Sequence, residues 1–213
     1  RPMSILEDAP QNRLPVKTYV CQENDGLIKE VISRELARDG QVYFLHNRID
    51  TIYSVAGKLK KMFPNITVGV AHGSMDANQI ADVMNDFYDK KIEILVSTSI
   101  IESGLDVPNV NTIIVEDSQN FGLAQLYQIK GRVGRSNRLA YAYLLYRDYD
   151  RISDEGRKRL KALKDFTELG SGYKIAQQDL AIRGSGNILG SEQAGFVDSL
   201  GYETYTKLLK MQN

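Results

Sequence analysis

The chain has 213 residues, and its 27 basic and 27 acidic side chains give no formal net charge at pH 7. Apolar residues at 42% and charged residues at 25% are ordinary globular values, and the length suffices for one large domain with a buried core. Zero net charge excludes a global field that would attract a polyanion, so any contact with nucleic acid must come from local basic patches.

Residues 1–15 open the chain with three of its five prolines and no apolar period, which predicts a linker or an extended arm. After them, short apolar runs alternate with helical patterns. The expected strands lie at 16–21, 41–46, 67–71, 92–97, 111–115 and 140–145. The expected helices lie at 27–38, 50–62, 76–88 and 122–133, with a helical turn at 99–103. This alternation predicts that residues 16–150 form an α/β fold, a parallel sheet flanked by helices.

The pattern changes after Tyr146. A charged helix is expected at 153–169, with its basic side chains exposed, and a Gly-Ser-Gly break ends it. A second helix at 173–182 leads into a glycine-rich stretch, and a last helix is expected at 202–210. The segment 151–213 is therefore predicted to form a helical hairpin and a loop. A local basic patch spans residues 130–164, which carry eleven Lys and Arg against four acids.

Polar residues follow two of the expected strands. Ser97 and Thr98 end the fourth strand, and a turn with Gly104 and Asp106 comes next. Loops at the carboxyl ends of parallel strands bind ligands, and short hydroxyls there can take phosphate oxygens while an acid takes a ribose hydroxyl. The alternative is an ordinary capped turn. At the end of the third strand, His72 is a candidate DNA contact, although a satisfied structural role is more usual for a lone histidine.

The most informative run is Gln128-Ile-Lys-Gly-Arg-Val-Gly-Arg135, which sets two arginines three residues apart, each directly after a glycine. On a helix this spacing puts Arg132 and Arg135 on one face. The glycines let a phosphate or another backbone come close. Two guanidinium groups aimed at one place suit a terminal phosphate that gains charge during transfer. The alternative is a solvated basic helix end.

The segment from Ser97 to Asp106 resembles motif V of the superfamily 2 helicases, and the run from Gln128 to Arg135 resembles motif VI. Val42–Arg48 lies where motif IV belongs. The resemblance implies a RecA-like second lobe whose two arginines are catalytic across a cleft. The residues implied to contact the nucleotide are Gly104, Asp106, Gln128, Arg132 and Arg135. Those implied to contact the nucleic-acid backbone are Ser97 and Thr98.

Two helicase motifs are missing from the sequence. It has no G-x-x-x-x-G-K-[ST] phosphate loop, since Gly57-Lys58 is followed by Leu59, and no acidic motif of the D-E-x-H type follows a strand. The resemblance therefore implies that ATP and Mg²⁺ are held mainly by a missing first lobe, and that this fragment alone hydrolyses no ATP. A chain that starts at Arg1 without a methionine is itself expected to be a fragment.

The stretch from Asp179 to Gln193 resembles the helical hairpin and loop shared by RecG and the transcription-repair coupling factors. The amino-acid sequence of the whole chain most resembles the coupling-factor family. This implies part of an ATP-dependent translocase on double-stranded DNA that displaces stalled RNA polymerase and helps to recruit excision-repair proteins. It also implies that Arg183 and Gln193 couple ATP turnover to movement. Two alternatives stay open: a RecG-like lobe that remodels forks, and a non-catalytic module that only docks on DNA or a partner.

The sequence also predicts the cellular compartment of the protein. The single Cys21 excludes an internal disulfide and indicates a reducing environment. The longest apolar run, Ala140–Tyr146, is too short to span a bilayer, and no signal peptide opens the chain. These features predict a soluble cytoplasmic protein without a membrane partner.

Overall fold

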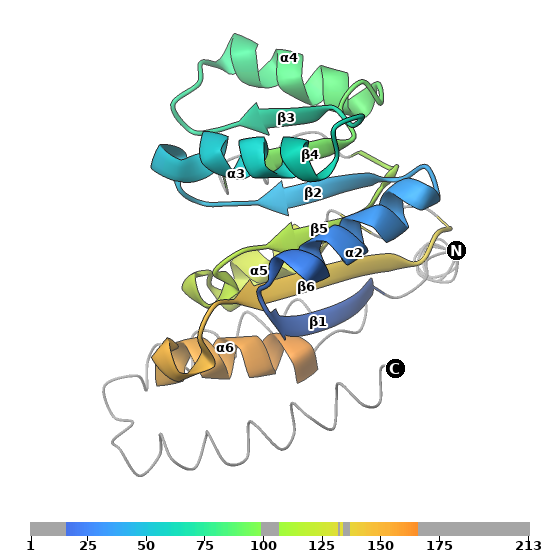
Figure 1. The fold of residues 1–213 in the computed structure, drawn as a ribbon. Coiled ribbons are helices and arrows are strands. Elements are labelled where there is room, and N and C mark those ends of the chain that lie inside the picture. Colours follow the sequence, from blue (N-terminus) through green and yellow to red (C-terminus); the bar gives the residue numbers. More distant parts are fainter. Residues whose placement is uncertain (1–15, 99–106, 132, 134–136, 166–213) are drawn as a thin grey trace, which may run out of the picture.

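The computed structural model describes residues 16–98, 107–131, 133 and 137–165 (Figure 1). Four predicted segments lie outside the described residues: the arm at 1–15, the turn at 99–103, and the helices at 173–182 and 202–210. The helix predicted at 153–169 is described only as far as residue 165.

Parallel strands form one six-stranded sheet in the order β1-β6-β5-β2-β4-β3. The strands are β1 (Val16–Gln22), β2 (Gln41–Leu45), β3 (Val68–Ala71), β4 (Ile94–Ser97), β5 (Val110–Val115) and β6 (Ala140–Tyr146). Every residue of the central strands β2, β4 and β5 is buried, as expected for strands covered on both faces. The predicted α/β fold with a parallel sheet is confirmed.

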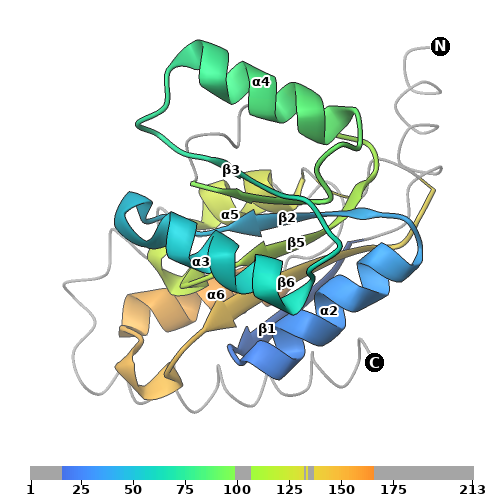
Figure 2. The ribbon, with the colours of Figure 1, turned by 45° about the horizontal axis from the view of Figure 1, so that its top comes forward.

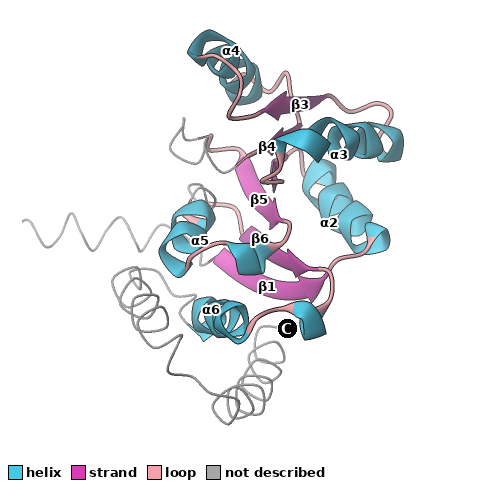
Figure 3. Ribbon diagram, turned by 90° about the vertical axis from the view of Figure 1, so that its left-hand side faces the viewer, coloured by secondary structure: helices cyan, strands magenta, loops and turns pink. Residues whose placement is uncertain are grey.

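Helices cover both faces of this sheet. They are α2 (Asp25–Ala37), α3 (Ile49–Met62), α4 (Ala77–Tyr88), α5 (Leu123–Lys130) and α6 (Asp154–Asp165), with 3-10 turns η2 (Ser118–Asn120) and η3 (Tyr149–Arg151). Figure 3 shows α2 and α3 on one face and α4, α5 and α6 on the other. Each face has its own apolar core, which includes Ile32 and Ile52 on the first and Phe87, Leu126 and Leu160 on the second.

The sequence determines several helix ends locally. Asn24 caps α2 by accepting the Leu27 N–H at 2.7 Å, and Asp76 and Gln79 form both bonds of a capping box on α4, at 2.8 and 3.0 Å. Helix α5 ends three residues earlier than predicted, because Gly131 lies at its C-cap and glycine is a poor helix former.

All carboxyl strand ends meet at one edge of the sheet because the strands are parallel. In Figure 1 the arrowheads of β2, β3 and β6 point to this edge, on the left. Figure 2 shows α2 and α3 over the same face, and an ion pair between Lys58 and Asp25 joins these two helices. In open α/β sheets ligands bind outside this carboxyl edge, so the candidate site is expected there.

Candidate functional site

Polar side chains stand directly after each strand at the carboxyl edge. They are Glu23 after β1, His46 after β2, His72 after β3, Thr98 after β4, Glu116 after β5 and Arg147 after β6. Four of the residues predicted to act here belong to the described part of the chain: His72, Ser97, Thr98 and Gln128. The other predicted site residues lie outside the described residues: Gly104, Asp106, Arg132, Arg135, Arg183 and Gln193.

Ser97 and Thr98 lie at the end of β4 and are buried, with 0% and 4% exposure. The Thr98 N–H donates to the Ala71 carbonyl at 3.2 Å, which ties this strand end to β3. Neither hydroxyl oxygen has a hydrogen-bond partner within the described residues. A buried hydroxyl without a partner is costly, so both are available to a group outside that part of the chain.

Gln128 lies on the exposed side of α5. The opposite side of the helix packs into the core through Leu126 and Ile129, and Val133 beyond the helix end is also buried, with 3% exposure. Val133 is the residue between the two glycine–arginine pairs of the sequence motif. Val133 is therefore part of the core, while Gln128 is accessible on α5.

Both ring nitrogens of His72 are engaged within the chain. The Ser74 N–H donates to Nδ1 at 3.1 Å, and Nε2 lies 3.0 Å from the Tyr53 hydroxyl on α3. The two rings meet edge to face, with centroids 5.6 Å apart and planes at 82°. Sequence reasoning considered His72 alone and missed Tyr53, because the link between α3 and the end of β3 is a tertiary contact.

A buried cluster at the ends of β1, β2 and β5 was also missed. His46 Nδ1 lies 2.8 Å from Glu116 Oε1, and His46 Nε2 lies 2.6 Å from the Thr51 hydroxyl. Glu116 also shares a hydrogen bond with Glu23, which requires one carboxyl to carry a proton. The strand order brings His46 and Glu116 together across 70 positions, so no local sequence signal could have found the pair.

The two carboxyls of this cluster have shifted pKa values in opposite directions. Burial, the hydrogen bond to Glu116 and the charge of Glu116 raise the pKa of Glu23 to about 8. Burial also acts to raise the pKa of Glu116, but the hydrogen bonds from His46 and Glu23 outweigh it and lower that pKa. At neutral pH Glu23 is therefore the partner that carries the proton.

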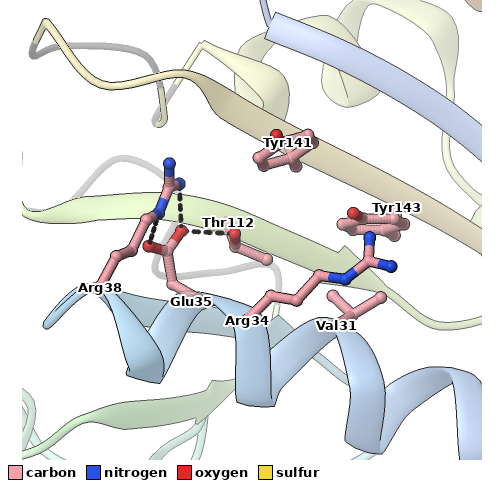
Figure 4. A pocket seen from close by; sticks show the side chains of 7 residues that line it. All are labelled: Val31, Arg34, Glu35, Arg38, Thr112, Tyr141 and Tyr143. Carbon is pink, nitrogen blue, oxygen red and sulfur yellow. Dashed lines mark hydrogen bonds and ion pairs between the residues drawn. The ribbon is translucent and has the colours of Figure 1, made fainter. Parts of the chain in front are cut away.

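A small cavity of about 100 Å³ lies between α2 and strands β5 and β6 (Figure 4). On its wall the enclosed carboxylate of Glu35 accepts from both Nε and Nη2 of Arg38, at 2.5 and 2.8 Å, and from the Thr112 hydroxyl at 2.5 Å. The Arg38 guanidinium also lies 5.5 Å from the Tyr141 ring centroid. With both carboxylate oxygens bonded inside the chain, this cluster ties α2 to β5 and offers no free group for chemistry.

The basic helix α6 differs from the sequence expectation that its cations are exposed. Arg157 donates to the Tyr149 carbonyl at 2.9 Å and stacks on that ring, and Lys161 pairs with Asp165 at 2.7 Å. Arg159, only 15% exposed, pairs with Glu155. The prediction of exposed cations is wrong for these residues, because α6 packs against α5 and η2 and its long side chains reach neighbouring groups.

No helix in the described ranges combines the length and the apolar composition needed to cross a membrane. Within those same ranges, no three His, Cys, Asp or Glu side chains converge as the ligands of a metal ion do.

The class of protein follows from the fold together with a family match. The profile of the helicase conserved C-terminal domain matches residues 23–137, which is 115 of the 213 residues. The chain therefore belongs to the helicase conserved C-terminal domain family, and its parallel sheet is a RecA-like lobe of the superfamily 2 type.

Comparison with individual proteins narrows this class. The chain is 52% identical over 210 residues to the transcription-repair-coupling factor of Bacillus subtilis (strain 168), a match that covers 99% of this chain and 18% of that relative. The factor of Staphylococcus haemolyticus (strain JCSC1435) is 49% identical over the same shares. The resemblance to the transcription-repair coupling factors is confirmed. The chain spans about a fifth of the length of these curated relatives.

Solved structures agree with this assignment. RecG bound to a three-way DNA junction matches with a TM-score of 0.71 and 32% identity, over 93% of this chain and 26% of that chain. The C-terminal domain of the DEAD-box protein Dbp5 matches with a TM-score of 0.53 over 71% of this chain and 84% of that chain. At 18% identity, the Dbp5 likeness concerns the fold alone.

Proposed function

We propose that the chain is the second motor lobe, residues 16–150, and the coupling hairpin, residues 151–213, of an ATP-dependent double-stranded DNA translocase. In this proposal the parent protein displaces stalled RNA polymerase and brings excision-repair proteins to the site, in the cytoplasm. The observation that carries it is the 52% identity over 99% of the chain, a span that includes both the motor motif and the glycine-rich tail.

The nucleotide side of the proposal concerns five residues. Arg132 and Arg135 stabilise charge on the transferred phosphate, while Gly104, Asp106 and Gln128 contact the nucleotide from this lobe. The exposure of Gln128 and the burial of Val133 support this role, because Val133 lies in the core between the two Gly-Arg pairs while the Gln128 side chain is open to a ligand. A bound Mg²⁺ neutralises charge on the phosphates, and both it and ATP are held mainly by the missing first lobe. Residues 1–213 alone then hydrolyse no ATP.

The DNA side of the proposal lies at the ends of β3 and β4. Ser97, Thr98 and His72 face the duplex there, and Arg183 with Gln193 couples lobe closure to movement along it. The unpartnered hydroxyls of Ser97 and Thr98 support this role. Such contacts go to phosphates, so affinity falls steeply with salt and depends little on base sequence.

A RecG-like, fork-remodelling lobe is the second candidate, favoured by the TM-score of 0.71 to RecG on a three-way junction. The two candidates differ in what the intact parent does to DNA. A translocase of the coupling-factor kind moves along a continuous duplex without separating its strands. A preference for branched over linear duplex in ATPase stimulation would favour the second candidate.

The test of the motor role is Arg135→Ala in the intact parent. An arginine that meets charge only in the transition state is worth about 10³–10⁵ in rate, or about 4–7 kcal/mol. We expect DNA-stimulated kcat to fall by that factor while ATP binding is largely kept, and Arg135→Lys to rescue little because lysine lacks the planar fork. Near-normal kcat in Arg135→Ala would show that this residue is only a basic helix end.

A further inference from the structure

Three large apolar or aromatic side chains are more exposed than the rest of their kind in the described chain: Ile49, Tyr53 and Tyr88. Ile49 and Tyr53 are 43% and 58% exposed and stand four residues apart in the first turns of α3, so they share one side of that helix. Helix α3 begins at the carboxyl edge of the sheet. An exposed apolar and aromatic pair at this edge is open to contact with a ligand bound there.

The hydrogen bonds of His72 determine whether the Tyr53 hydroxyl donates or accepts in its bond to this histidine. Because the Ser74 N–H donates to Nδ1, that nitrogen carries a lone pair, and the proton of the neutral ring is on Nε2. Nε2 therefore donates to the Tyr53 oxygen over 3.0 Å. The tyrosine accepts this bond, which leaves its own O–H proton free to be donated elsewhere. The edge-to-face contact of the two rings holds the phenol in this orientation.

The surroundings suit a sugar–phosphate backbone. Arg48, at the N-cap of α3, is 60% exposed and lies 3.6 Å from Asp50, so this pair brings no net charge. His72 directly follows Ala71, whose carbonyl accepts from Thr98, so His72 stands at the end of β3, the strand next to the one that carries the two unpartnered hydroxyls. Tyrosine hydroxyls are common donors to DNA phosphates, and an apolar side chain beside one can cover a deoxyribose.

We propose that the Tyr53 hydroxyl, held by His72, donates a hydrogen bond to a backbone phosphate of duplex DNA, and that Ile49 packs against the adjoining sugar. The inference rests on the proposed function, that the parent moves on double-stranded DNA. His72 is then a positioning residue that acts on DNA through Tyr53. Because Tyr53 is uncharged, it fixes the register of the strand without adding to the ionic part of binding.

The test is Tyr53→Phe in the intact parent, compared with Tyr88→Phe as a matched control. Tyr88 ends α4 at the opposite edge of the sheet and is 52% exposed, so the control removes the same hydroxyl from a side chain of similar exposure. Affinity for a linear duplex is measured over a range of salt concentrations. We expect Tyr53→Phe to weaken binding about tenfold, since a hydrogen bond to a charged group is lost, and Tyr88→Phe to leave it unchanged. The slope of log K against log salt should stay the same in both variants.

A double-mutant cycle tests the positioning role of His72. His72→Phe should weaken binding as Tyr53→Phe does, and the double variant should lose no more than either single change, because both act through one hydrogen bond. Additive losses would mean that His72 acts on DNA independently and would overturn the positioning role.

Three outcomes separate the inference from the proposed function. If the wild-type parent binds duplex and Tyr53→Phe binds equally well, the inference is wrong and the proposed function stands. If Tyr53→Phe raises KM for ATP while DNA affinity is unchanged, the phosphate belongs to the nucleotide and the inference is also wrong. If the wild-type parent neither binds duplex nor hydrolyses ATP in its presence, the proposed function itself fails.

Discussion

Glu35 shows how a charge is tolerated inside this lobe. Its carboxylate is enclosed between α2 and β5, and Arg38 and Thr112 bond both of its oxygens. The sequence predicts α2 from its apolar period, and Glu35 lies within that helix beside the buried stripe. Its burial depends on Thr112, which is 77 positions away, so only the folded sheet explains why an acid is tolerated at that place.

Gly40 makes this arrangement possible and supplies a stability prediction. A Cβ at this position would collide with the Glu35 carboxylate. Gly40→Ala should displace that group from Arg38 and lower the free energy of unfolding by about 3 kcal/mol, because a buried charge then loses its partner. Gly57→Ala is the matched control. Its Cβ meets nothing within 4 Å, in the interior of α3, so it should stabilise by about 0.5–1 kcal/mol. Denaturant unfolding gives the free energy of unfolding of both variants. Equal values for the two would contradict the packing argument.

At the scale of the elements, local patterns predicted most of what was found. Periodicity located all six described strands, and Asn24 and Asp76, residue types that favour N-caps, cap α2 and α4. The order of the strands was beyond reach, because β1 pairs with β6 through register contacts between distant segments. Hence the sequence marked single residues at strand ends, such as His72, and missed partners such as Tyr53 and Glu116.

The Glu23–Glu116 pair, at the ends of β1 and β5, leads to a pH prediction. The folded pKa of Glu23 is raised to about 8 from an ordinary value of 4.5, so the protonated form is favoured by folding. Its contribution to stability is complete below about pH 4.5 and is lost as the pH rises through about 8. The opposite holds for Glu116, whose lowered pKa makes its contribution disappear only as the solution becomes acidic. Between about pH 5 and 8 the Glu23 effect therefore acts alone within this pair.

Glu23→Gln checks this assignment. Glutamine stays neutral at every pH, so the fall in melting temperature between pH 5 and 8.5 should be smaller in the variant than in the wild-type chain. Glu30→Gln, on the exposed side of α2, removes a carboxylate without touching the cluster and should keep the wild-type pH profile. If Glu23→Gln and the wild type have parallel profiles, the two carboxyls do not share a proton.

On the scale of the whole molecule, the described sheet and helices are one RecA-like lobe, and the proposed motor activity belongs to the intact parent. The sequence contains no phosphate loop, and the chain spans about a fifth of its curated relatives. Sequence resemblance, rather than spacing or periodicity, is the basis of the roles proposed for Arg183 and Gln193, because a glycine-rich stretch has no propensity from which a geometry can be argued. These roles are therefore tested best in the intact parent, where ATP turnover and movement can be measured separately.

Arg183→Ala and Gln193→Ala should separate these two activities. Neither residue is proposed to contact ATP, so DNA-dependent hydrolysis should be largely present in both variants. Displacement of a triplex-forming strand, or of a stalled polymerase, should nevertheless be lost, since lobe closure would no longer move the loop along the duplex. Both activities are measured on one preparation, with Arg135→Ala as the control that loses hydrolysis and displacement together. Displacement that survives both substitutions, or that declines only in proportion to hydrolysis, would mean that this loop is a solvated surface segment and that coupling resides elsewhere in the parent.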